Sequence, residues 1–264
     1  MIGASFSLDA LCGKDAAFGD PAIFLKKLKD HGVESIEIRP VPIGCSADEA
    51  ARVVNEIWNL GLKVTLHADV DSLESAVCDV FYPLEKIFSQ NRQGRIVIIV
   101  HPIVGDNTAM LKLLSDYIYD NHLPAVIALE NNRLMPDGSV GDCTEVVLDA
   151  VICANRDNVG ICFDTGHYYN YVMRNRAETP EILPDKEFMR RVIHTHIHAL
   201  MGYTPHFPVG KHSLPLERYM SALPQGYNGV YDLEIDHYRL VKDGLDPLAE
   251  LIESVNYLKD IVQI

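Results

Sequence analysis

Six segments of this sequence each end an apolar run with a histidine or an acidic residue. These six residues are His67, His101, Glu130, Asp164, His196 and Glu234. Imidazole nitrogens and carboxylate oxygens are the ligands that proteins offer to zinc, manganese and similar divalent cations. A single residue of this kind is explained as well by a hydrogen bond or a helix cap. Six in equivalent positions predict a metal centre, provided that the fold brings them together.

The segment "RVIHTHIHAL" carries histidines at alternate positions, His194, His196 and His198. A β-strand points alternate side chains to one face. With a rise of about 3.3 Å per residue, the outer two are about 13 Å apart, so one ion cannot bind all three. His196 is the best placed of the three. We expect His194 to lie deeper, in the core or behind a ligand, and His198 to lie where the chain leaves the strand.

The elements that must position these residues alternate along the chain. Apolar, β-branched runs predict strands at 2–8, 33–40, 62–67, 95–101, 124–130, 158–164, 191–198 and 229–236. Amphipathic segments predict helices at 20–32, 46–61, 72–90, 107–121, 142–154, 214–222 and 246–262. Such alternation favours a parallel sheet covered on both faces. For 264 residues we predict one domain, 1–264, folded as a single (β/α)8 TIM barrel, with an open doubly wound sheet as the alternative.

In a parallel barrel the carboxyl ends of all strands lie at one face, where the following loops build the site. The six strand-end residues are therefore expected at one rim. One connection, 166–191, lacks a clean amphipathic pattern. It is predicted to be either an irregular surface helix or a lid over the site.

Composition limits the class of partner and the location. The chain has 37 acidic and 23 basic residues, a formal charge of −14, which disfavours binding to nucleic acid. Its six cysteines are scattered singly, as expected for reduced thiols. The first residues lack the basic stretch of a signal peptide, and no apolar run approaches the ~20 residues of a membrane helix. We expect a soluble cytoplasmic protein, with the oligomeric state, homo-oligomer included, left open.

Several motifs resemble the xylose-isomerase-like TIM barrel superfamily, which contains sugar isomerases, ketose epimerases, inosose dehydratases and apurinic-site endonucleases. The motifs are "LHADV", "VHPIVGDN", "LENNR", "FDTGH", "HTHIHA", "HFPVGKH" and "DLEI", and they span nearly the whole chain. The combination of "FDTGH" with an "HxHI" strand and a later "PxGK" is the most specific. This resemblance implies a metal-dependent enzyme that acts on a small carbohydrate-like molecule.

The resemblance also implies individual roles. The main metal would be held by Glu130, Asp164, His196 and Glu234. In the endonuclease pattern His67 and His101 resemble ligands of a second zinc that shares Glu130, and His167 and His206 resemble ligands of a third. In the epimerase pattern His167 resembles a residue that contacts substrate. The metal is expected to be Zn²⁺ or Mn²⁺, with Co²⁺ and Mg²⁺ as alternatives.

Three positions depart from the family patterns. Ala199 and Thr204 stand where an aspartate is expected, and Gly202 stands where the epimerases have an arginine. The missing aspartate at Thr204 puts a third metal in doubt. Neither subfamily fits cleanly.

The first functional hypothesis is an isomerase or epimerase of a small sugar, polyol or sugar phosphate, with Glu130 and Glu234 as acid/base pair and His167 as a further catalytic residue. Contacts to substrate are expected from Glu37, Arg39, Arg133, Tyr168, Tyr169, Lys211 and Arg239. The cations among them are explained equally well as solvated surface charges. The second hypothesis is a di- or trinuclear zinc hydrolase of phosphate esters. A dehydratase or lyase, and a non-catalytic sugar-binding barrel, are further alternatives.

Overall fold

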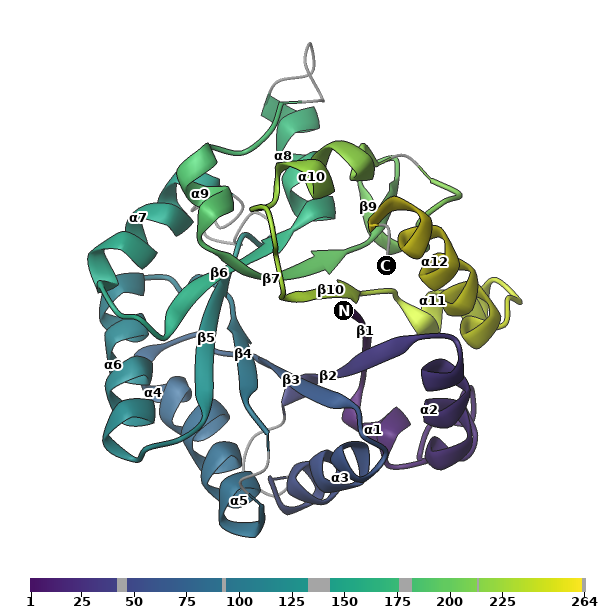
Figure 1. Cartoon of the computed structure of the whole chain (residues 1–264), viewed down its shortest axis with the longest axis horizontal. Coiled ribbons are helices and arrows are strands. Elements are labelled where there is room, and N and C mark those ends of the chain that lie inside the picture. Colours follow the sequence, from purple (N-terminus) through teal and green to yellow (C-terminus); the bar gives the residue numbers. More distant parts are fainter. Residues whose placement is uncertain (42–46, 92–93, 133–142, 176–181, 213, 263–264) are drawn as a thin grey trace.

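The strands of the chain close into an eight-stranded parallel barrel, which confirms the predicted fold (Figure 1). The computed structural model describes residues 1–41, 47–91, 94–132, 143–175, 182–212 and 214–262. The order around the barrel is β1–β10–β7–β6–β5–β4–β3–β2. The strands are β1 (Ile2–Phe6), β2 (Val33–Val41), β3 (Lys63–Ala68), β4 (Ile96–Val100), β5 (Ala125–Glu130), β6 (Val159–Asp164), β7 (Val192–Ile197) and β10 (Val230–Leu233).

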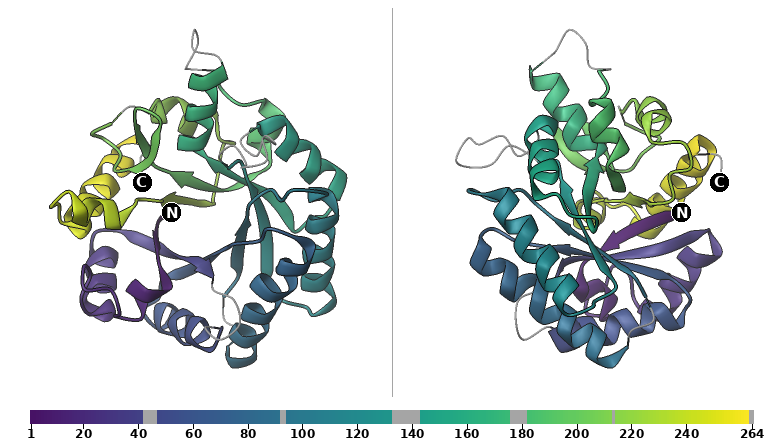
Figure 2. Two further views of the ribbon diagram at one scale, coloured as in Figure 1. Left: turned by 180° about the vertical axis from the view of Figure 1, so that it is seen from behind. Right: turned by 60° about the vertical axis from the view of Figure 1, so that its left-hand side comes forward.

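Helices surround the barrel, as the views from behind and from an oblique direction show (Figure 2). They are α1 (Leu8–Leu11), α2 (Pro21–Asp30), α3 (Ala47–Asn59), α4 (Leu73–Ala76), α5 (Tyr82–Gln90), α6 (Asn107–Asp120), α7 (Thr144–Ala154), α8 (Thr165–Asn175), α9 (Lys186–Arg190), α10 (Leu216–Ala222), α11 (His237–Lys242) and α12 (Pro247–Val262). A π-helical turn, η2 (Val77–Phe81), joins α4 to α5, so the helix predicted at 72–90 is three consecutive segments. No helix in the described part of the chain is long and apolar enough to cross a membrane.

The main hydrophobic core lies between the barrel and its helices. Outward-facing strand residues alternate with inward-facing ones and pack against the apolar faces of the helices. Phe163 of β6, for example, has ring centroids within 5.6–5.8 Å of Tyr168, Phe188 and Tyr219, which come from α8, α9 and α10. Tyr168 therefore belongs to the core, not to the rim where a substrate contact was predicted.

The connection 166–191 also differs from the sequence prediction. Its first part is the regular helix α8, which follows β6 directly, and its last part contains the short helix α9. The buried residues Tyr168 and Val172 hold α8 against the core. Residues 166–175 thus form a helix, as one of the two alternatives predicted, but a regular one that packs on the core; residues 176–181 lie outside the described part.

A two-stranded antiparallel hairpin follows β7 and was not predicted. It consists of β8 (Ala199–Met201) and β9 (Thr204–Phe207). Gly202 lies at its turn with a φ of +65°, a conformation that favours glycine. The hairpin carries the chain out from β7 and brings His206 back over the barrel.

His237, the first residue of α11, joins the loop after β10 to β1. Its ring stacks on Phe6 with a centroid distance of 5.1 Å, and its Nε2 donates to the carbonyl of Ser5 at 3.0 Å. Burial lowers the pKa of His237 to about 4. The folded protein therefore holds this imidazole neutral at pH values where an unfolded chain would protonate it.

A pH dependence of stability follows from His237. An unfolded histidine has a pKa of about 6.5, so between roughly pH 6.5 and 4 the unfolded state binds a proton that the folded state does not. The free energy of unfolding should fall with pH in that window, by up to about 1.4 kcal/mol per unit from this residue. Urea unfolding at pH 7 and pH 5 should show a larger loss in the wild type than in His237→Gln. Equal losses would contradict the assignment.

Candidate active site

One carboxylate oxygen, Oε2 of Glu130 at the end of β5, lies at the centre of the rim residues. It is 3.0 Å from Nδ1 of His196, 3.5 Å from Nε2 of His101 and 3.6 Å from Nε2 of His67. The Nε2 atoms of His67 and His101 are themselves 2.8 Å apart. Side chains from β3, β5 and β7 and from the residue after β4 therefore converge, as their strand-end positions predict.

Glu234, directly after β10, completes this group from the opposite side of His196. Arg39 of β2 donates to Glu234 Oε1 through one guanidinium nitrogen and to the carbonyl of Ile235, at 2.8 Å, through the other. The remaining carboxylate oxygen, Oε2, is 3.5 Å from Nδ1 of His196. Arg39 thus fixes the orientation of Glu234 and leaves Oε2 directed at the shared position.

The residues at this position fit a divalent cation. Among the described residues, Glu130 Oε2, Glu234 Oε2 and His196 Nδ1 are buried and make no hydrogen bond. Ligands at about 2.0–2.1 Å from a tetrahedral ion are roughly 3.3 Å from one another, close to the separations found here. Burial opposes ionisation of both carboxyls, but His196 and His101 lower the pKa of Glu130, and His206 and Arg39 lower that of Glu234. Both groups are therefore anionic.

Asp164, the last residue of β6, is held by hydrogen bonds at both oxygens. Oδ1 accepts from the backbone N–H of His167 at 2.6 Å, and Oδ2 lies 3.1 Å from Nε2 of His198. His198 accepts the backbone N–H of His206 at Nδ1, so Nε2 carries the proton and donates it to Asp164. His198 follows the last residue of β7, where the chain leaves the strand as predicted, and it is fully buried.

A glycine allows this arrangement. A Cβ at Gly166, in the "FDTGH" motif, would lie 2.1 Å from a ring carbon of His198. Only glycine at this position lets the imidazole pack against the start of α8.

His167 and His206 form a second cluster with His198. His206 has a φ of +64°, a left-handed conformation that is costly for a residue with a side chain and that concentrates at functional sites. Burial lowers its pKa to about 3. Thr204, which replaces the aspartate of the endonuclease pattern, is exposed. The cluster thus offers the imidazoles of His167 and His206 to a ligand, because both nitrogens of His198 already make hydrogen bonds.

A cavity of about 390 Å³ opens above the rim residues. Five of the predicted site residues line it: Arg39, His67, His101, His206 and Glu234. Its other lining residues are Ser7, Asp15, Phe18, Asp69, Asp236, His237 and Tyr238, which the sequence analysis did not single out. Asp69 and Asp236 follow His67 and Glu234 by two positions, so extending the period-two pattern past the strand ends would have found them. Asp15 and Phe18 come from a loop and carry no such signal.

Four of the predicted substrate contacts lie elsewhere. Lys211 is paired with Glu250 and Glu253 on α12, and Arg239 with Asp236 and the carbonyl of Pro205. Tyr168 is in the outer core, and Glu37 is fully buried beneath the rim. Arg133 lies outside the described residues. Tyr169 packs against the outer core. Among the predicted substrate contacts that the structure describes, only Arg39 lines the cavity.

Glu37 of β2 lies behind the rim and supports two of its histidines. Its Oε2 is 3.1 Å from Nε2 of His196, and its Oε1 is 3.6 Å from Nδ1 of His67. Ser5 and Thr65 also donate to this carboxylate. A carboxylate behind a metal-binding imidazole fixes the tautomer and orientation of the ring. Glu37 is therefore placed to position ligands, not to contact substrate.

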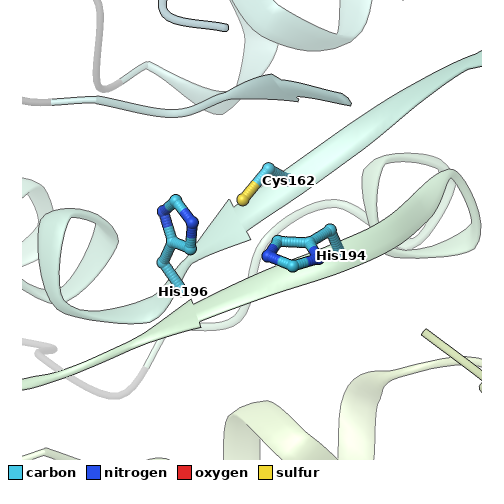
Figure 3. Close-up of side chains that lie close together, drawn as sticks. All are labelled: Cys162, His194 and His196. Atoms are coloured by element: carbon cyan, nitrogen blue, oxygen red, sulfur yellow. The ribbon is translucent and has the colours of Figure 1, made fainter. Parts of the chain in front are cut away.

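Below the rim, the interior of the barrel has an apolar side and a polar side. Ile99, Ala128 and Cys162 form a small apolar cluster on one side. The other side holds Ser5, Glu37, Thr65, His194 and Asp232, all at most 2% exposed. The sulfur of Cys162 on β6 lies near the rings of His194 and His196 on β7, at the boundary between the two sides (Figure 3).

Comparison with known proteins identifies two archaeal relatives. One uncharacterized protein of Methanocaldococcus jannaschii is 34% identical over 85 residues, which are 29% of this chain and 32% of that protein. A second is 28% identical over 179 residues, which are 61% of this chain and 57% of that protein. The chain therefore matches about a third and just over half of the lengths of these relatives.

Solved structures with similar folds include sugar epimerases. A xylose isomerase domain protein from Alicyclobacillus acidocaldarius has a TM-score of 0.64 and 15% identity, with 99% of this chain and 98% of that chain covered. D-psicose 3-epimerase has a TM-score of 0.65 and 12% identity, with 98% and 99% covered. At these identities the likeness concerns the fold alone. A model of the Xylose isomerase-like TIM barrel family matches residues 111–261, more than half of the sequence, and the chain belongs to this family.

Proposed function

We propose that this protein is a divalent-metal-dependent isomerase or epimerase of a small sugar, polyol or sugar phosphate. The observation that carries the proposal is the convergence of Glu130 Oε2, His196 Nδ1 and Glu234 Oε2, buried and without hydrogen bonds, beneath a cavity of about 390 Å³. The fold shared with sugar epimerases agrees with it. A cavity of this volume is large enough for a monosaccharide.

Two carboxylates on opposite sides of one position suit proton transfer beside a carbonyl. A bound divalent ion would withdraw electron density from a carbonyl oxygen and so acidify the neighbouring C–H bond. Glu234, which Arg39 orients, would accept that proton. Glu130 faces the same position through its own Oε2 and would return a proton on the other face of the substrate.

The polar groups around the cavity would orient the hydroxyls of such a substrate. Asp15, Asp69 and Asp236 line its wall together with Ser7. Carboxylates are good acceptors for sugar hydroxyls. The aromatic rings of Phe18 and Tyr238 offer an apolar surface on the same wall. These contacts favour a neutral polyhydroxy ligand over a strongly anionic one.

A second candidate function is hydrolysis of phosphate esters by two metal ions. The cluster of His67, His101 and Glu130 favours it, because these three donors lie within 3.6 Å of one another and share Glu130 Oε2 with His196. Two ions on either side of one carboxylate oxygen would activate an attacking water. The −14 charge still argues against nucleic acid as the ester.

Solvent deuterium separates the two functions. The Mn²⁺-loaded protein should be incubated in D2O with a panel of ketoses and their phosphates, and the products analysed by NMR and for free phosphate. We expect deuterium at the carbon beside the carbonyl and no phosphate release. Glu234→Gln should lower the incorporation by at least about 10²-fold, the usual contribution of a general base, with an unchanged circular dichroism spectrum. Phosphate release without deuterium would favour the hydrolase, and wild-type exchange in Glu234→Gln would remove that residue from the reaction.

The number of catalytic metals can be tested at His67. If one ion held by Glu130, His196 and Glu234 suffices, His67→Ala should keep turnover within about tenfold, because it removes only a neighbour of Glu130. Activity should be measured together with elemental analysis of the purified protein. A collapse in rate together with the loss of one metal equivalent would instead support a dinuclear site.

A further inference from the structure

The polar half of the barrel interior contains more charge than the rim site explains. Glu37 and Asp232 are both fully buried, and the hydroxyl of Ser5 lies between them, 3.0 Å from Glu37 Oε1 and 2.5 Å from Asp232 Oδ2. One hydroxyl proton can serve only one carboxylate at a time. No lysine or arginine of the described chain forms an ion pair with either carboxylate. A buried carboxylate is costly to keep ionised unless hydrogen-bond donors or a cation balance its charge.

A histidine without hydrogen bonds lies in the same place. His194 is fully buried, and neither of its ring nitrogens makes a hydrogen bond, although Nε2 is 3.3 Å from Glu37 Oε2. His194 therefore has a ring nitrogen available to bind a ligand. Asp232 Oδ1 is also buried without a partner. Native proteins leave few buried polar atoms unsatisfied, and several together call for a ligand.

A glycine in β1 leaves space for the carboxylate of Asp232. Gly3 on β1 is the lateral neighbour of Asp232 on β10. A Cβ at Gly3 would lie 2.4 Å from Asp232 Oδ1, so the glycine makes room for the carboxylate. TIM barrel interiors are usually filled with valine, isoleucine and leucine, so this polar layer is a departure from ordinary packing.

We propose that Glu37, His194 and Asp232 hold a second divalent transition-metal ion, Zn²⁺ or Mn²⁺, inside the barrel beneath the rim site. Ligand atoms of these residues and His196 all lie within 4.8 Å of one another. A divalent cation would balance the charges of the two carboxylates. An imidazole ligand beside them selects a transition metal over Mg²⁺ or Ca²⁺.

This inner ion is distinct from the rim ion. His194 and Asp232 precede His196 and Glu234 by two residues on the same strands, which corresponds to roughly 6.6 Å along the barrel. His194 and His196 nevertheless offer ligand atoms within 4.8 Å of one another, so the two ions would be neighbours bound through different atoms. A neutral imidazole has one lone pair, so His196 serves the rim through Nδ1 and donates from Nε2 to Glu37. Glu37 then links the two ions through His196.

Metal counting on purified protein refolded in Zn²⁺ tests the proposal. The inner ion is enclosed, so a chelator should remove rim metal from the folded protein and leave one zinc per chain. Asp232→Asn, which keeps the size of the side chain, should lose that equivalent. Ser35→Ala removes another buried hydroxyl without a partner and should retain it. Unchanged chelator-resistant zinc in folded Asp232→Asn would overturn the proposal.

A variant lacking the rim ligands gives a measurement that does not depend on Asp232→Asn folding. Glu130→Gln combined with Glu234→Gln should bind no rim metal and still carry one chelator-resistant zinc. Cobalt substituted into this variant should show the visible absorption of a nitrogen- and oxygen-bound ion. Absence of any resistant metal would refute the inner site while leaving the proposed function untouched. A wild type that carries the resistant zinc but never binds a second, chelatable ion would contradict the proposed function and leave the inner site standing.

Discussion

Carboxylates buried inside a closed barrel must find positive charge there, and this constraint organises the interior of the protein. Glu37, Glu130, Asp164 and Asp232 are each at most 1% exposed, and Glu234 is 4% exposed. Arg39 pairs with Glu234, and imidazoles lie beside Glu37, Glu130 and Asp164. Such groups are costly to bury unless they are paired or bind a cation. The barrel therefore has a polar axis within an apolar shell of strands and helices.

His196 connects the rim residues with the polar residues beneath them. Its Nδ1 is directed at Glu130 and Glu234, and its Nε2 is directed at Glu37. A carboxylate behind a ligating imidazole orients the ring and increases its basicity. The geometry of the rim therefore depends on residues that no substrate reaches. The strands, which are rigid and hydrogen-bonded on both sides, are the elements best able to hold such an arrangement.

The sequence predicted the barrel and the rim because both follow from local periodicity. Alternation places His67, Glu130 and His196 on the inner face, and parallel strands bring their ends together. Alternation does not say how deep in the barrel a side chain lies, however. Glu37 was therefore predicted to contact substrate, although it lies beneath the rim residues. Contacts between distant segments could not be predicted from the sequence either. Lys211 pairs with Glu250 on α12, and the β8–β9 hairpin places His206 beside the cavity. These positions depend on tertiary contacts that no local pattern encodes.

The central claim is that Glu130, His196 and Glu234 share one cation. Crystals grown with Mn²⁺ or Zn²⁺ and measured at the absorption edge of that metal would locate the ion by anomalous scattering. We expect a peak about 2.0–2.2 Å from Glu130 Oε2, His196 Nδ1 and Glu234 Oε2. A fully loaded crystal with no peak among these three atoms, or with the three side chains directed apart, would contradict the account.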